Sequence, residues 1–478
     1  MAEEIFYPVD EVAKRLGLGR AEVYRKVVDG DLKGEKRERR LCFTESELVR
    51  FEAVVADEGQ ILKEALGEAL AFFAKRLELH SELSAPGPEM ESTSDPEMET
   101  TAQVAELGRR IFLDAISGGI PDFFLDPLHD GARLLLGPEG NRRELAHYPG
   151  PLASLLRDWL KKMVSLPEEG TVREAVGQHE IDRQQYQFRL KVVPTLLGEL
   201  VHVHFFLDQS EGGLEALGYS ESQVRAMQKL LSGHPGILLI TGAPGPSADG
   251  HRLGLARFLA TEGRLVVALD RRVQYRDERL VQLDMSSGEE AHVADMWRTA
   301  LDMQPNALCV EVFDLAVEKR YLLENVGAGA LVIAQISASG NLPALESLAS
   351  GGSDRQVFVR ALLGMVESVA LRRLCPHCRT MQPASDDAVE KVNIEPGVAI
   401  GEAQGCECCG DGYLGRRLLF GVWPLDEQLV EWASTLEPRA VPPAPLGELS
   451  LQQAMRLAVL DGEVHWSEAL PYLAEGVR

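Results

Sequence analysis

The chain has 478 residues, which at roughly 150 residues per domain predicts about three domains. Hydrophobic residues make up 45% and charged residues 26%, a balance typical of a folded chain and not of a disordered one. The 49 basic and 74 acidic residues give a formal charge of −25, which excludes binding of nucleic acid or anionic lipid over the whole surface. No apolar run reaches the about 18 residues of a membrane-spanning helix, and the acidic first residues are not a signal peptide. We therefore expect a cytoplasmic protein.

Residues 1–80 predict a small helical domain followed by a long helix. Apolar residues at helical spacing end at a glycine-containing turn (17–19), and a second short helix follows. A basic run then leads into a strand that we interpret as the return strand of a wing, and Thr44 with Glu47 predicts a capping box for the long helix. Residues 11–44 hold ten Lys or Arg against six Asp or Glu, a local basic excess in an acidic protein.

This arrangement resembles the winged helix-turn-helix domain of the MerR and phage-excisionase type. The resemblance implies that the second helix enters the major groove of DNA and that the wing touches phosphates. The side chains then expected to face DNA lie on the second helix and on the wing: Arg20, Arg25, Lys26, Arg37, Arg39 and Arg40. A small module that docks on another protein is the alternative, because helix-turn-helix shapes also serve as protein adaptors.

Two stretches predict breaks between domains. Residues 81–103 carry three prolines and six acidic residues without Lys or Arg, which predicts an acidic, disordered linker. Four prolines in 437–446 exclude a helix or a central strand and separate the C-terminal helices, which are expected up to residue 478. Strands and helices alternate between the two breaks. From 211 to 436 the short apolar runs are typical of parallel strands covered by helices on both faces, so the expected fold class is α/β.

Five of the seven cysteines lie between Cys375 and Cys409, a clustering that predicts a metal site and not a disulfide framework. Two C-x₂-C pairs with a spacer of 27 residues (379–405) are the pattern of a closed, tetrahedral Zn²⁺ site. The expected ligands are the four cysteines that end these pairs: Cys375, Cys378, Cys406 and Cys409. Cys408 is a spare or an alternative to Cys406, and His377 could replace one thiolate.

Several stretches line up in order with one family of ATPases. They are AISGGIPDFFLDPLHDGARLLL (115–136), VPTLLGELVHVHFF (193–206), a run into a glycine-rich loop (217–245), the four-cysteine insertion and the closing helices (450–470). From about residue 104 onward the chain resembles the type II secretion and type IV pilus assembly ATPases (GspE/PilB-like). The resemblance implies a PAS-like α+β domain over 104–210, a RecA-like domain over 211–436 with a zinc insertion at 375–409, and assembly into a hexameric ring at the inner membrane.

The glycine-rich loop departs from the pattern that this family needs for ATP. A P-loop reads G-x-x-x-x-G-K-[ST], in which the lysine neutralises phosphate oxygens and the hydroxyl holds Mg²⁺. Two alignments are possible. If the motif begins at Gly242, Ala248 takes the lysine position and Asp249 the hydroxyl position; if it is shifted to Gly245, His251 and Arg252 take them. Neither register has the lysine. In the first, Asp249 would set a like charge against the triphosphate, at roughly 4 kcal/mol for a contact near ~4 Å at an effective dielectric of about 20. Binding of ATP–Mg²⁺ in the family's manner is therefore not expected.

The other boxes of the family are altered as well. By the resemblance, four residues remain from the aspartate box, the paired arginines and the Walker B strand: Asp270, Arg298, Glu311 and Asp314. Ser337 stands where the histidine box has its histidine, and Asp302 replaces the second arginine. Four altered boxes together indicate a pseudo-ATPase, in which the remaining acids serve packing or helix capping.

Three functions stand as hypotheses. The first is a catalytically degenerate relative of the secretion and pilus ATPases that binds structural Zn²⁺ and acts as a partner or regulator, in a homo- or hetero-oligomer with ATPase-type subunits. The second is a DNA-binding regulator that uses the helix-turn-helix, with the ATPase-derived body for oligomerisation. The third is an active ATPase with a divergent loop, in which His251 or Arg252 contacts phosphate. We favour the first, with membrane association only through partners.

Overall fold

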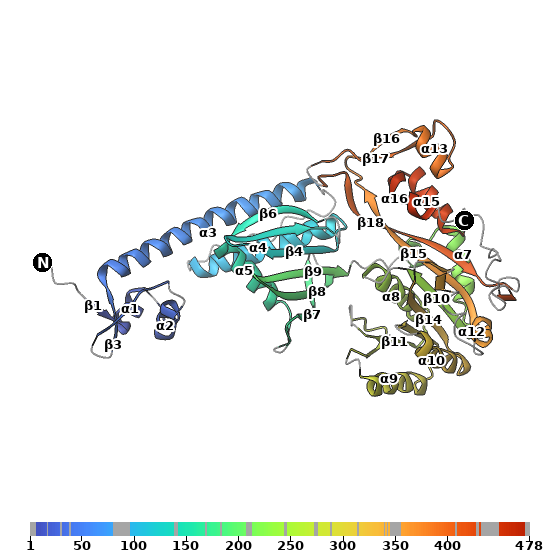
Figure 1. Ribbon diagram of the computed structural model, residues 1–478, viewed down its shortest axis with the longest axis horizontal. Helices are drawn as coiled ribbons and strands as arrows, with labels where there is room; N and C mark the ends of the chain where they lie inside the picture. The colour runs from blue at the N-terminus through green and yellow to red at the C-terminus, as the bar shows by residue number, and fades with distance from the viewer. Residues whose placement is uncertain are drawn as a thin grey trace.

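The structure is a computed structural model, and its parts follow one another in chain order from the N-terminal module to the C-terminal body (Figure 1). It describes residues 6–16, 18–28, 31–37, 40–79, 96–137, 142–167, 170–181, 184–206, 213–242, 246–271, 276–286, 289–312, 315–338, 340–341, 343–344, 355–406, 409–426, 430–431 and 449–473.

The N-terminal module consists of two short helices and a three-stranded antiparallel sheet with the strand order β1-β3-β2. Its elements are β1 (Phe6–Pro8), α1 (Val9–Leu16), α2 (Arg20–Val28), β2 (Glu35–Arg37) and β3 (Arg40–Thr44). Val12, Val23 and Phe43 are buried in one apolar cluster, which joins both helices to the sheet. The two helices begin and end where the apolar spacing predicted them.

A single long helix, α3 (Glu45–Leu79), leads from this module to the rest of the molecule (Figure 1). The Thr44 hydroxyl accepts a hydrogen bond from the Glu47 backbone N–H at 3.2 Å, as the predicted capping box requires. The Glu47 carboxylate accepts instead from the backbone N–H of Lys33, at 2.7 Å. Glu47 therefore holds the loop before β2, because tertiary contact brings that loop next to the helix start.

The next helix, α4 (Pro96–Ser117), corrects the predicted linker. Residues 81–95 lie outside the described residues, but 96–103, the last part of the predicted linker 81–103, are helical. Proline suits the first position of a helix, where its missing N–H has no partner to lose. Farther along, Val104 and Leu107 are buried, and this packing stabilises the helix against the weak local preference of its acidic start.

A six-stranded antiparallel sheet with the order β6-β5-β4-β9-β8-β7 stands where the resemblance implied a PAS-like domain. Its elements are β4 (Asp122–Pro127), β5 (Gly131–Leu136), β6 (Arg143–Pro149), α5 (Gly150–Lys162), β7 (Arg173–Ile181), β8 (Gln184–Thr195) and β9 (Gly198–Phe206). The ring of Phe112 on α4 lies 5.4 Å from that of Phe188 and 4.8 Å from that of Phe205, centroid to centroid. These buried rings hold α4 against the sheet.

A seven-stranded sheet with the order β12-β11-β13-β14-β10-β15-β18 forms the body. Its elements are α6 (Gly213–Ala216), α7 (Glu221–Leu230), β10 (Gly236–Gly242), α8 (Pro246–Thr261), β11 (Val266–Asp270), β12 (Val281–Asp284), α9 (Glu290–Asp302), β13 (Ala307–Val312), α10 (Leu315–Gly327), β14 (Leu331–Ser337), α12 (Arg355–Ala361), β15 (Leu362–Leu374) and β18 (Tyr413–Pro424). Neighbours from β12 to β15 are parallel, and β18 is antiparallel to β15.

Side chains on the two faces of this sheet enter two different cores. Ile237 and Leu239 of β10 share a cluster with Trp297 of α9, whereas Leu238 and Ile240 share one with α7 and α8. The central strands are therefore buried on both faces, as their apolar runs predicted.

A small subdomain completes the body. It contains the hairpin β16 (Thr380–Pro383) and β17 (Ala399–Glu402) with the helices α13 (Asp386–Val392), α15 (Leu451–Leu460) and α16 (Trp466–Leu473). The proline-rich stretch at 437–446 lies outside the described residues, and the helices expected after it are present. None of the helices in the described part of the chain is both long and apolar enough to cross a bilayer.

Candidate functional site

The strand β10 ends at Gly242, where the chain turns toward α8. A Cβ on Gly242 would lie 2.8 Å from the Ser368 hydroxyl oxygen and 2.9 Å from the Ser368 carbonyl oxygen, so this position has no room for a side chain. Gly245 lies outside the described residues. Ala248 and Asp249 are in the first turn of α8, with side chains outside the described set. The parallel strands all end at this edge of the sheet, which is where α/β proteins bind ligands.

Arg252 of α8 is turned into the core. Its Nη2 donates to Asp270 Oδ1 at 2.8 Å, and the two side chains are 2% and 0% exposed. Gln282 of β12 donates to the other oxygen of Asp270 at 3.1 Å. The charge of Arg252 is thus matched inside the protein by the last residue of β11.

His251 is also turned inward. Its Nε2 lies 2.5 Å from the Tyr219 hydroxyl oxygen, and its ring centroid is 4.5 Å from that of Phe420. Burial lowers the pKa of His251 to about 3, so the ring is neutral at physiological pH. Burial likewise raises the pKa of Tyr219. A neutral, buried imidazole supplies no cation to a phosphate.

The other remnants of the nucleotide boxes lie on different elements of the body. Arg298 lies on the exposed face of α9 and pairs with Asp295 at 2.6 Å. Glu311 is half-buried near the end of β13, beside Gln335 of β14 in the strand register. Asp314 lies outside the described residues. Among the remnants whose side chains the structure describes, Arg252 and Asp270 are in contact.

A polar contact that the sequence did not indicate lies at the same edge. Thr241 donates to Asn341 Oδ1 at 2.9 Å, and both side chains are buried. Ser368 donates to the Thr241 carbonyl oxygen at 3.3 Å. Thr241 precedes Asn341 by 100 positions and Ser368 by 127, so no local sequence pattern indicates these contacts.

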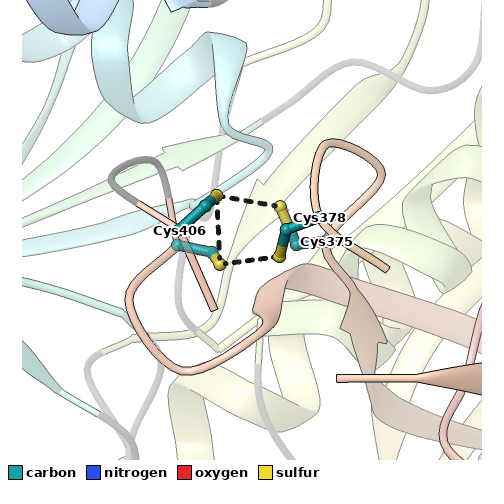
Figure 2. Close-up of side chains that lie close together, drawn as sticks. Cys375, Cys378 and Cys406 are labelled. Carbon is teal, nitrogen blue, oxygen red and sulfur yellow. Dashed lines mark hydrogen bonds between the residues drawn. The ribbon is translucent and has the colours of Figure 1, made fainter. Parts of the chain in front are cut away.

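The four predicted cysteine ligands form one compact group (Figure 2). Their Sγ atoms lie within 4.8 Å of one another, and neighbouring sulfurs are 3.5, 3.6 and 3.9 Å apart. Four thiolates at the usual Zn–S distance of about 2.3 Å around one tetrahedral ion would be about 3.8 Å apart. The separations therefore fit a tetrahedral metal and are far too long for disulfide bonds.

The backbone shapes this group through two tight loops. The Arg379 N–H donates to the Cys375 carbonyl oxygen at 2.9 Å, and the Gly410 N–H donates to that of Cys406 at 2.7 Å. Gly412 donates its backbone N–H to Cys409 Sγ at 3.3 Å. Burial raises the pKa of Cys375, and that of Cys409 to about 11, so a cation must be present to hold these sulfurs as thiolates. Cys408 lies outside the described residues, and His377, which is exposed, is not among the four side chains that the described part of the chain brings together.

The residues predicted to face DNA are described in part. Arg20, on α2, pairs with Asp10 at 3.0 Å, and Lys26 pairs with Asp31 at 3.0 Å. Arg25 is exposed on the same helix. The remaining predictions are Arg37 and Arg40, whose side chains lie outside the described set, and Arg39, which is not described. Two of the three cations described on α2 are therefore partly neutralised by neighbouring acids.

A parallel α/β sheet that carries a four-cysteine group is the arrangement that the resemblance to the secretion and pilus ATPases implied. The family model of Type II/IV secretion system proteins matches residues 99–469, and the chain belongs to that family. This confirms the resemblance inferred from the sequence.

Individual relatives are distant. Type II secretion system protein E of Klebsiella pneumoniae is 24% identical over 384 residues, which cover 78% of this chain and 76% of that protein. The type IV pilus assembly ATPase PilB of Pseudomonas aeruginosa is 25% identical over 333 residues, 66% of this chain and 57% of PilB. Among solved structures, the Legionella pneumophila ATPase DotB has a TM-score of 0.50 at 12% identity, over 81% of this chain and 95% of DotB. At that identity the likeness concerns the fold alone.

Proposed function

We propose that the protein is a catalytically degenerate member of its family and acts as a structural or regulatory subunit beside secretion- or pilus-ATPase-type subunits, in the cytoplasm. The observation that carries this proposal is the buried pair of Arg252 and Asp270. In the register from Gly245, Arg252 directly follows the lysine position and is the cation that could take over the role of the missing lysine. It is held 2.8 Å from a carboxylate inside the core instead.

Phosphate binding at this loop would require a cation to leave that pair. Removing one partner from a buried ion pair costs about 3–5 kcal/mol. The new contact between Arg252 and the triphosphate would have to offset this cost. The neutral, buried His251 gives no alternative charge. The loop therefore lacks the electrostatic stabilisation on which phosphoryl transfer depends.

Titration of the purified full-length protein with ATP–Mg²⁺ by calorimetry tests this proposal. We expect no binding heat, no phosphate release and no shift of the unfolding midpoint, whereas a ligand at 100 times its Kd would add about 2.7 kcal/mol of stability. The variant Ala248→Lys/Asp249→Thr restores both missing groups and serves as the comparison. Binding in that variant alone would locate the defect in these two side chains; micromolar binding with turnover by the unaltered protein would contradict the proposal.

We further propose that Zn²⁺ occupies the four-cysteine group as a structural ion. All four ligand positions are filled by sulfur, which leaves no open coordination site for substrate or water, and thiolates favour Zn²⁺ over the harder Mg²⁺ or Ca²⁺. The role of such a site is to hold two loops in one conformation. Bound Zn²⁺ would supply folding energy and no chemistry.

A second candidate function is DNA binding by the N-terminal module. It is favoured by the exposed Arg25 on α2 and by the local basic excess of residues 11–44 in a chain of net charge −25. Fluorescence anisotropy with a labelled duplex would be measured at several salt concentrations. Arg25→Ala should flatten the salt dependence by about one phosphate contact, and Arg225→Ala, on the exposed face of α7, should not. Salt-independent or absent binding would leave the module as a protein adaptor.

A further inference from the structure

The four cysteines do not stand apart from the N-terminal half of the chain. Cys375 and Cys409 are 0% and 5% exposed, and with Leu414 they belong to the apolar cluster that forms the core of the six-stranded-sheet domain. Cys378 and Cys406 pack against the same cluster. The metal group is therefore part of the contact between this domain and the body, although the two are far apart in sequence.

Two glycines show how closely the two surfaces approach. Gly415 has a φ of +73°, and a Cβ on it would lie 2.8 Å from the carbonyl oxygen of Gly119, in the turn after α4. Gly410, with a φ of +80°, directly follows Cys409, and a Cβ on it would lie 2.8 Å from Nη1 of Arg143. A side chain on Gly415 would meet backbone and push the domains apart, whereas one on Gly410 would meet the end of an arginine side chain, which can shift.

Cationic side chains gather at this contact. A cavity of about 310 Å³ is lined by Cys409 and by four arginines from both domains: Arg76, Arg142, Arg143 and Arg372. Arg76 pairs with Asp114 at 2.9 Å, and Arg372 pairs with Glu468 at 2.6 Å.

A metal with four thiolates would explain this gathering of positive charge. A dipositive ion with four thiolates carries a net charge of −2, and a buried charge of that size requires countercharge nearby. Arg142 and Arg143 of the six-stranded-sheet domain line the same cavity as Cys409 and are the cations placed to supply part of it. The negative charge of the metal with its four thiolates would balance the positive charge of the arginines, so the cavity needs no anionic ligand.

We propose that the metal ion locks the six-stranded-sheet domain onto the body. When the metal is bound, Cys375 and Cys378 are held against Cys406 and Cys409. This fixes Gly410, which lies beside Arg143, and the start of β18, where Gly415 lies against Gly119. When it is removed, the four sulfurs no longer share a cation. The backbone hydrogen bond from Cys375 to Gly412 still joins the two segments, but the cysteines lose their fixed spacing and the docking surface is weakened. This proposal rests on the proposed binding of Zn²⁺ by the four cysteines and is independent of whether the protein hydrolyses ATP.

Docking and metal binding must then stabilise one another by the same factor, because a coupling free energy is reciprocal. Coupling of the usual size predicts a zinc affinity about 5- to 150-fold lower in a variant that cannot dock. The four ligands stay unchanged in such a variant, so ligand loss cannot account for the effect.

Gly415→Ala and Gly397→Ala form a matched pair for this test. Both glycines have positive φ, +73° and +83°, so alanine strains the backbone alike at each, but nothing lies within 4 Å of a Cβ at Gly397. Zinc affinity would be measured on the full-length protein by competition with a chromogenic chelator. We expect Gly415→Ala to lose affinity and Gly397→Ala to keep it. Arg143→Ala, which leaves the loop backbone intact, should lose affinity as well and covers the case in which Gly415→Ala does not fold.

Hydrogen–deuterium exchange gives the reciprocal measurement. Removal of zinc with a chelator should raise exchange in peptides that cover 118–121 and 143–149, which belong to the other domain and hold no ligand. Unchanged exchange there after zinc removal, or equal zinc affinity in the Gly415→Ala and Gly397→Ala variants, would overturn the proposal.

Discussion

Gly108 of α4 lies directly against the indole of Trp159 on α5, and a Cβ on Gly108 would overlap the ring. By helix propensity alone, alanine at this position would be favoured by about 1 kcal/mol. The contact reverses this expectation, because an extra methyl group in a packed core costs about 1–3 kcal/mol.

The first prediction compares two glycines in helices. Gly108→Ala should lower the free energy of unfolding, whereas Gly67→Ala on α3, where nothing lies within 4 Å of a Cβ, should raise it by up to about 1 kcal/mol. Urea denaturation followed by circular dichroism measures both. Equal effects of the same sign would show that α4 and α5 do not pack as described.

The second prediction concerns the buried pair of Arg252 and Asp270. Asp270→Ala removes the carboxylate partner of a buried guanidinium and should lower the free energy of unfolding by about 3–5 kcal/mol. The double variant Arg252→Met/Asp270→Leu, which removes both charges, should lose less. Arg298→Ala breaks an exposed pair with Asp295 and should cost under about 1 kcal/mol. A cost for Asp270→Ala as small as this control would indicate that the pair is open to solvent.

The third prediction is a pH dependence from His251. Its pKa is about 3 when folded, against roughly 6.5 in the unfolded chain, so below about pH 6.5 the unfolded chain takes up a proton that the folded protein does not. Stability from this group is therefore unaffected above that pH and is lost as the pH falls from about 6.5 toward 3. Between pH 7.5 and 5.5 the loss should reach about 1.4 kcal/mol.

The midpoints of urea unfolding at pH 7.5 and pH 5.5 test this pH dependence. His251→Gln keeps a polar side chain next to Tyr219 but cannot titrate, so this part of the pH dependence should disappear. His147→Gln, at an exposed histidine of β6, should retain the wild-type dependence. If His251→Gln behaves like wild type, the imidazole is accessible to protons in the folded state.

The fourth prediction concerns metal content. The purified protein should hold about one zinc ion per chain, because a closed tetrahedral site takes four thiolates. Cys375→Ser should lose most of it on dialysis, and Cys42→Ser, at a cysteine outside the group, should not. Mass spectrometry of the metal after denaturation measures this. Full zinc content in Cys375→Ser would mean that another side chain completes the site.

The strands of the parallel sheet were predictable where local pattern decided them. The apolar runs at Ile237–Thr241 and Ala307–Val312 are too short for helices and apolar on both faces, and both are strands. The long antiparallel pair β15 and β18 was not predicted as strands from pattern, because neither strand alternates regularly between buried and exposed positions and their pairing joins segments some fifty residues apart. The start of α4 was missed because its acidic residues gave no sign of the packing that begins at Val104.

The cysteine group was predictable because ligand spacing is a local property. The direction of Arg252 was not. The sequence allowed it to face a phosphate, and the structure turns it toward Asp270, which only the position of β11 beside α8 could decide. The contact between Arg143 and Gly410 is of the same kind, since it joins two domains.

The sequence by itself determined the family, the class of sheet, the cluster of four cysteines and the absence of a P-loop lysine, because residue type and short spacing set all of these. Only the tertiary structure decided which groups the charged side chains contact, as the pair of Arg252 and Asp270 shows. A guanidinium is stable either in water or beside a buried carboxylate. Which of the two it adopts depends on the distant segments that fold against it.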